Sequence, residues 1–157
     1  MNLQYSEKYR TLDVPQCQKL HFYCFCKRPP FFPNLKEDLF LTFKAHYRNL
    51  WHHYFENTDA VIFVVDSTDR ERFDEAAEEL HDLIKDDRLR NAALLVLANK
   101  QDMPNAANPA EITDKFRLMD LRSHEWYVQA CSAINGEGLV DGLSWLAPKV
   151  KAQKKKF

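Results

Sequence analysis

Four polar residues follow directly after an apolar run in the second half of the chain. Asn99, Lys100, Gln101 and Asp102 come after residues 92–98, all of which are apolar. A carboxylate can accept from two adjacent donors, an Asn amide can donate and accept, and a lysine stem can lie over a flat ring. Guanine matches this set, because its N1–H and 2-amino group are adjacent donors and N7 is an acceptor. The Asn-Lys-x-Asp pattern therefore predicts a guanine-reading loop.

A second segment, Cys131-Ser132-Ala133, follows another run with strand character, residues 125–130. A backbone N–H of this segment could donate to guanine O6, whereas adenine has an amino group there and would be opposed. The two segments together would then distinguish guanine from adenine. The alternative is that the first segment is a polar loop that caps a helix and binds nothing.

Regular alternation of strand and helix patterns places both segments. Three buried runs, residues 60–65, 92–98 and 125–130, predict strands. Helical spacing of apolar residues predicts helices over 70–86, from 109 through 116, and over 136–151. Residues 66–69 read as a cap for the first of these helices, Asn108 as the N-cap of the second, and Pro148 as a kink in the last turn of the third. Alternation of this kind predicts an α/β fold with a parallel sheet, whose ligands bind at the carboxyl ends of the strands.

The first 57 residues are less regular. Residues 28–33 contain three prolines and predict an extended loop. Residues 20–26 could form a strand that covers the free edge of the strand at 60–65. Residues 36–56 fit a helix with Trp51 and Tyr54 on one side.

Composition limits the classes of protein to consider. The chain has 157 residues, 45% of them hydrophobic, which suits one domain with a buried core. The net charge of −1 gives no general attraction to nucleic acid or to an acidic membrane. No apolar run is long enough for a transmembrane helix, and Asn2 occupies the place where N-myristoylation requires glycine. We therefore expect a cytoplasmic protein.

Beyond these patterns, the chain resembles the ADP-ribosylation factor family, small GTPases of vesicle traffic. The matching segments lie between residues 50 and 146 and read LWHHYFENTDAVIFVVDSTDRERFDEA, LLVLANKQDMPNA, AEITDKF and WYVQACSAINGEGLVDGLSWL. The resemblance implies a P-loop-GTPase-like, that is Ras-like, α/β domain that binds GTP and GDP. It also implies effectors and exchange factors as partners, and association with Golgi membranes.

By this resemblance, specific residues acquire roles. Asn99, Lys100 and Asp102 correspond to the family's guanine-recognition residues, and Cys131, Ser132 and Ala133 to its second guanine loop. Trp51 and Tyr54 lie in the segment that matches the aromatic surface shown to effectors. A position on the core face of a helix would explain Tyr54 equally well.

The chain departs from the family pattern in the parts that bind phosphate. A phosphate loop needs G-x-x-x-x-G-K-[ST], but the three glycines of this chain are Gly136, Gly138 and Gly142. The family's Asp-x-Gly-Gly-Gln segment is replaced by FLTFK at residues 40–44. No Mg²⁺ site or catalytic residue can be assigned. We expect an N-terminally incomplete GTPase-like domain that binds GTP and GDP weakly and does not hydrolyse GTP.

This view divides the chain into a divergent, poorly ordered segment (1–49), a half-domain (50–150) and a basic tail (151–157). One alternative is a nucleotide-free interaction module or decoy that engages the partners of intact family members. Another is that the N-terminal residues are an aberrant or alternatively spliced replacement with no selected function.

Two smaller features have plain explanations. Four possible zinc ligands, Cys17, His21, Cys24 and Cys26, lie close together, although a strand that contains two cysteines is the simpler reading and we assign no metal. The lysines near the C-terminus could contact anionic lipid or an import receptor, but cations also complement a helix C-terminus without any partner.

Overall fold

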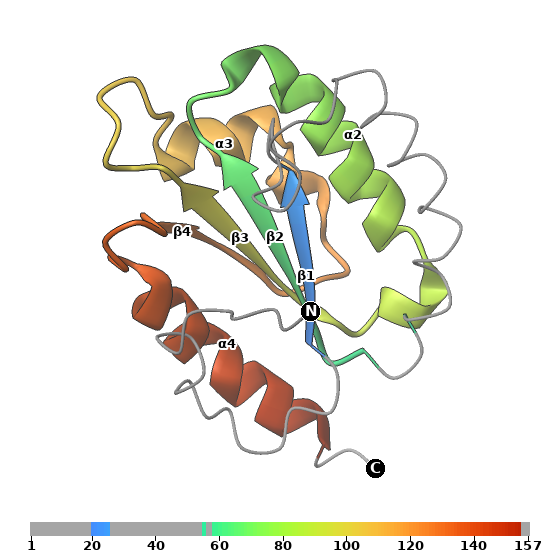
Figure 1. Cartoon of the computed structure of the whole chain (residues 1–157). Helices are drawn as coiled ribbons and strands as arrows, with labels where there is room; N and C mark the ends of the chain where they lie inside the picture. The colour runs from blue at the N-terminus through green and yellow to red at the C-terminus, as the bar shows by residue number, and fades with distance from the viewer. Residues whose placement is uncertain (1–19, 26–54, 56–57, 155–157) are drawn as a thin grey trace, which may run out of the picture.

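A computed structural model describes residues 20–25, 55 and 58–154. These residues form one four-stranded sheet in the order β1-β2-β3-β4, and every neighbouring pair is parallel (Figure 1). The strands are β1 (Leu20–Phe25), β2 (Ala60–Asp66), β3 (Ala93–Asn99) and β4 (Trp126–Ala130), and the α-helices are α2 (Phe73–Ile84), α3 (Pro109–Lys115) and α4 (Leu139–Lys154). Short 3-10 turns lie at Arg70–Arg72, Asp87–Leu89 and Leu118–Asp120. The described part is thus the α/β domain with a parallel sheet that the sequence predicts.

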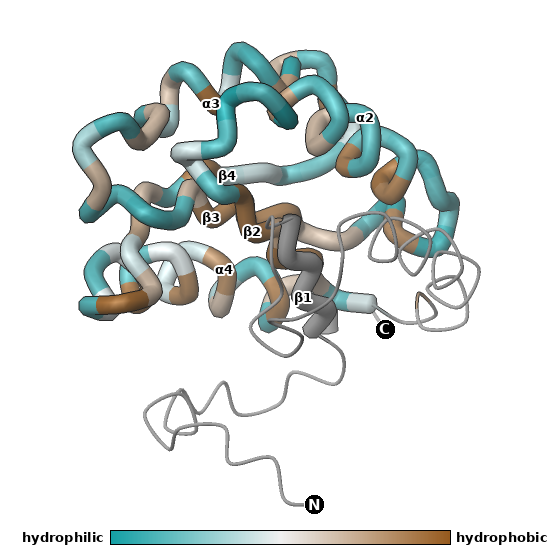
Figure 2. Tube along the Cα trace, turned by 45° about the horizontal axis from the view of Figure 1, so that its top comes forward, coloured by the Kyte–Doolittle hydropathy of each residue, from teal (hydrophilic) through white to brown (hydrophobic). Residues whose placement is uncertain are grey.

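Helices cover both faces of this sheet. Helices α2 and α3 lie on one face and α4 lies on the other (Figure 1). Alternate residues of β2 supply the two cores: Val61 and Phe63 pack with α2 and α3, whereas Ala60 and Ile62 pack with α4. The apolar colouring of β2 and β3 between polar outer helix faces shows the same layering (Figure 2). Burial on both faces explains why β3 has no polar residue before its last position.

The predicted strands are confirmed to within one or two residues. β1 pairs in parallel with β2, with Leu20 beside Ala60 and Phe25 beside Val65, so it covers the edge of β2 as predicted. Of the predicted helix over 36–56, only Phe55 is described, and it is buried and not helical. Most of the predicted N-terminal segment lies outside the described residues. In the described part of the chain, no helix combines the length and apolar composition needed to cross a membrane.

Two helix boundaries differ from the expectation. The first helix begins with a 3-10 turn at Arg70–Arg72 and becomes α-helical at Phe73. Neither the 3-10 turn nor α2 has a side-chain hydrogen bond that caps its N-terminus. Asp66 does not cap a helix, because its carboxylate accepts from Thr68 within the loop. Helix α4 starts at Leu139 and continues through Pro148 to Lys154, three residues beyond the predicted end at 151.

The start of α3 matches the prediction in detail. The Asn108 side chain accepts from the Glu111 N–H at 2.9 Å, and the Asn108 N–H donates to the Glu111 carboxylate at 2.9 Å, which forms a capping box. Pro109 occupies the first helical position, where its missing N–H costs nothing. This short helix follows the polar loop after β3, so its cap fixes where that loop ends.

Replacement of Asn108 by alanine should lower the free energy of unfolding by about 1 kcal/mol, since the Glu111 N–H loses its side-chain acceptor. Asn105→Ala in the same loop is the matched control, because Asn105 is exposed and does not cap the helix. Urea denaturation of both variants measures the difference. Equal stability of the two variants would contradict the capping role.

Candidate functional site

Three polar loops meet at the carboxyl edge of the sheet. They are residues 66–69 after β2, 99–102 after β3 and 131–133 after β4. The parallel register places Asp66 beside Asn99 and Ala98 beside Ala130, so the three strands end at the same level. This is the edge where ligands of parallel α/β sheets bind.

Hydrogen bonds join the loops after β3 and β4. The Ala133 N–H donates to Asn99 Oδ1 at 2.9 Å, and the Ser132 hydroxyl donates to Asp102 Oδ1 at 2.6 Å. The Gln101 N–H donates to the Cys131 carbonyl at 3.1 Å. The structure thus brings together all six residues that the sequence predicts for base recognition: Asn99, Lys100, Asp102, Cys131, Ser132 and Ala133.

Some groups in this cluster keep free hydrogen-bonding capacity. Within the described residues, the Asn99 amide nitrogen and the second carboxylate oxygen of Asp102 have no partner, and Asp102 is exposed. These are an amide donor for an atom such as N7 and an acceptor for adjacent N–H groups. The Ala133 N–H is already engaged by Asn99, so a base oxygen placed there would share that hydrogen.

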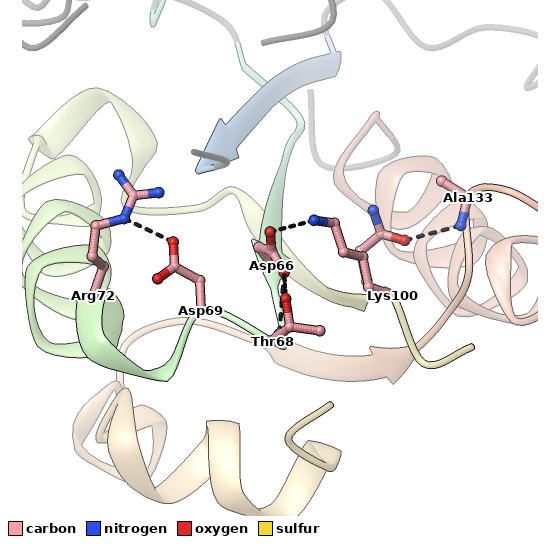
Figure 3. A network of polar contacts seen from close by, with 7 residues as sticks. Asp66, Thr68, Asp69, Arg72, Lys100 and Ala133 are labelled. Carbon is pink, nitrogen blue, oxygen red and sulfur yellow. Dashed lines mark hydrogen bonds and ion pairs between the residues drawn. The ribbon is translucent and has the colours of Figure 1, made fainter. Parts of the chain in front are cut away.

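Lys100 connects the loop after β3 to the end of β2. Its Nζ lies 2.6 Å from Asp66 Oδ2 (Figure 3). The Asp66 side chain is 5% exposed and that of Lys100 is 43% exposed, so the pair reaches from the interior to the surface. The Lys100 backbone has φ 67°, a left-handed conformation that non-glycine residues rarely adopt. Such a conformation persists where the surroundings hold it in place.

The Asp66 carboxylate is charged in spite of its burial. Desolvation by itself would raise its pKa, but the hydrogen bonds from Lys100 and Thr68 outweigh this, and the pKa lies below its ordinary value. Thr68 contributes its N–H at 3.1 Å and its hydroxyl at 2.7 Å, both to Oδ1. The two carboxylate oxygens are therefore held by donors from two different loops (Figure 3).

Gln101 braces the same loop from within. Its side-chain amide donates to the Ser67 hydroxyl at 3.1 Å and to the Ala107 carbonyl at 2.8 Å. The Ala107 N–H in turn donates to the Ser67 carbonyl at 2.8 Å. Gln101 occupies the variable position of Asn-Lys-x-Asp, and the sequence pattern predicts no role for it. The sequence pattern likewise predicts Asp66 only as part of a helix cap. For both Gln101 and Asp66, the available signal in the sequence was a polar residue at the end of a buried run.

Cys131 forms a wall of the site and is not a reactive group in it. Its side chain is buried, and burial raises the pKa of the thiol to about 11. The thiol lies 4.0 Å from Asn99 Oδ1 and is thus a weak donor in the contact between the loops. A thiol with a raised pKa is a poor nucleophile.

Other predicted residues lie outside the described part of the chain. Trp51 and Tyr54, the expected effector surface, are among them, as are Cys17 and Cys26 of the possible zinc set. Among the described residues, no three His, Cys, Asp or Glu side chains are grouped so that they could hold a metal ion.

The loop after β4 returns to the sheet through two glycines with positive φ. Gly136 has φ 84° and Gly138 has φ 72°. A Cβ at Gly138 would overlap the Ala130 carbonyl oxygen, whereas a Cβ at Gly136 would meet no atom within 4 Å. The close approach at Gly138 shapes the Cys131–Ala133 loop, because the Ser132 N–H donates to Glu137 O next to it at 3.0 Å.

Residues 41–150 match the model of the ADP-ribosylation factor family. Among solved structures, the chain is similar to the Arl6 (BBS3) small GTPase from Trypanosoma brucei, which was determined with the bound nucleotide analogue GppNp. The identity is 33%, the TM-score is 0.65, and the match covers 69% of this chain and 67% of that one.

Replacement of Gly138 by alanine should destabilise the protein more than replacement of Gly136. Both substitutions force alanine into a left-handed conformation at a cost of roughly 1 kcal/mol, but only Gly138→Ala also drives Cβ into backbone. Chemical denaturation of the two variants tests this order. Equal losses would show that the loop relaxes freely.

The low pKa of Asp66 predicts a pH dependence. The folded state binds fewer protons than the unfolded state, whose Asp titrates near 3.8. The stabilisation is therefore complete above that pH and is lost as pH falls through the lower folded pKa. Unfolding free energies measured below pH 5 should fall less steeply in Asp66→Asn than in the wild type. The exposed Asp120→Asn is the control for loss of a negative charge, and parallel curves for wild type and Asp66→Asn would contradict the prediction.

Proposed function

The chain belongs to the ADP-ribosylation factor family and has its small-GTPase fold, and from this premise we propose that it binds guanine nucleosides and nucleotides chiefly through the base. The main support for the proposal is that the loops 99–102 and 131–133 are hydrogen-bonded to each other. Ser132 orients the Asp102 carboxylate and Ala133 holds the Asn99 side chain, while one acceptor oxygen and one amide group stay free. The site is thus organised before any ligand arrives, which lowers the cost of binding.

Each proposed contact follows from hydrogen-bonding chemistry. The Asp102 carboxylate accepts from guanine N1–H and the 2-amino group, and the Asn99 amide donates to N7. The Lys100 stem lies against the purine face. The Ala133 N–H shares its hydrogen with O6, where the amino group of adenine would be repelled. Cys131 packs behind these groups as part of the wall.

Phosphate binding is proposed to be weak. The three glycines of the sequence lie at 136, 138 and 142, and no G-x-x-x-x-G-K-[ST] segment occurs. If about five phosphate hydrogen bonds of roughly 1.5 kcal/mol each are missing, some 7 kcal/mol, or about five orders of magnitude in affinity, is lost. Catalysis of phosphoryl transfer consists mainly of phosphate positioning and charge stabilisation. We therefore propose that GTP and GDP bind weakly and that GTP hydrolysis is absent.

Family membership is what supports the proposed cellular role. We place the protein in vesicle-mediated transport, in the cytoplasm and at Golgi membranes, with effectors or exchange factors of the family as partners. Trp51 and Tyr54 remain the proposed contact surface for effectors.

A titration with guanosine, GMP, GDP and GTP tests the function, with adenosine as the comparison ligand. All four guanine ligands should bind with similar dissociation constants, on the order of millimolar, because the phosphates add little. Adenosine should bind more weakly. Asp102→Asn should favour xanthosine over guanosine, because the new amide can donate to the 2-oxo group.

Calorimetry or NMR titration provides the measurement. Equal binding of adenosine and guanosine would overturn base recognition. GTP binding that is Mg²⁺-dependent and orders of magnitude tighter than guanosine binding would overturn the weak phosphate site.

A further inference from the structure

The Lys100 side chain is fixed at both of its ends. At the backbone end, the residue follows Asn99, whose carbonyl accepts from the Ser67 N–H at 3.1 Å, and precedes Gln101, whose amide is bonded to Ser67 and Ala107. At the other end, the ammonium group lies 2.6 Å from Asp66 Oδ2. The methylene stem thus spans from the end of β3 to the end of β2.

The orientation of Asp66 is fixed independently of Lys100. Thr68 donates twice to Oδ1, which turns Oδ2 toward the lysine. The register also places Asp66 directly beside Asn99, one residue before Lys100. A buried carboxylate in this position needs a compensating cation, and Lys100 is the cation that the structure supplies.

We propose that Asp66 is a positioning residue of the guanine site, which holds Lys100 so that its stem forms a preformed platform for the purine ring. This inference rests on the proposed base binding. A free lysine side chain would lose rotamer freedom when a base stacked on it, whereas an anchored stem has already lost that freedom on folding. Asp66 therefore raises affinity without contacting the ligand.

The proposed platform contacts the face of the ring, and this predicts a specific pattern of nucleoside affinities. Guanosine and inosine differ at the base edge read by Asp102 but present the same kind of ring face. Loss of the platform should weaken both nucleosides by the same factor. Loss of the Asp102 carboxylate, which reads the base edge, should change the ratio of the guanosine and inosine affinities.

Asp66→Asn is the first variant to test, in the full chain. The affinity for guanosine and for inosine should each fall by a factor on the order of three to ten, with their ratio unchanged. Asp82→Asn, which breaks the exposed 2.8 Å ion pair with Lys85, is the matched control and should leave both affinities unchanged. Guanosine affinity equal to wild type in Asp66→Asn would overturn the inference.

A double-mutant cycle shows whether Asp66 acts through Lys100. Lys100→Met keeps an apolar stem but removes the ammonium group. In that background, Asp66→Asn should have no further effect on guanosine binding, because its partner is already absent. Additive losses would place the action of Asp66 elsewhere and overturn the inference.

Two further measurements separate positioning from a purely structural role. NMR relaxation of the Lys100 methylene groups in the ligand-free protein should report an ordered stem in wild type and a mobile one in Asp66→Asn. Unchanged order would overturn the inference. Thr68→Val removes one of the two hydrogen bonds that orient Asp66. It should lower the order of the Lys100 stem and the affinity for guanosine, each by less than Asp66→Asn does. This variant replaces Asp66→Asn in the test if Asp66→Asn does not fold. Absence of guanosine binding in wild type would instead overturn the proposed function, and this inference with it.

Discussion

The parallel register of β2, β3 and β4 is the constraint on which the site depends. β3 is buried on both faces and hydrogen-bonded along both edges, so its position is fixed by two neighbours at once. A slip of one residue would exchange the faces of every side chain, moving Leu94 and Leu95 into the wrong cores. The same register sets Asn99 level with Asp66, and the core thereby positions the polar loops.

Electrostatics at this edge follow from burial. The Asp66 carboxylate has little contact with water, so it stays charged only because Lys100 and Thr68 replace the lost hydration. Buried pairs of this type often add little net stability, but the loss of one partner is costly. The pair is therefore best understood as a geometric link between two loops. Gln101 adds an uncharged link between the same loops.

Much of the fold could be predicted because it depends on local pattern. Alternating buried runs and helical periodicity predicted the three strands after residue 58 and the parallel sheet, and the Asn108 capping box follows from four adjacent residues. The start of α2 was less predictable. Asp66 had two possible uses, as a helix cap or as an acceptor inside its loop, and both suit an aspartate after a strand. Only the conformation of the loop, with Thr68 facing Oδ1, decides between them.

The sequence by itself determined which chemical groups stand at the ends of the strands: the Asn-Lys-x-Asp segment, the Cys-Ser-Ala segment and the family to which they are similar. The tertiary structure alone decided how those groups are paired. Lys100 meets Asp66 across 34 positions of chain, and Ser132 meets Asp102 across 30. Spacing along the chain carries no information about such contacts, because the partner of a hydrogen bond is selected by distance in space, and strand register sets that distance.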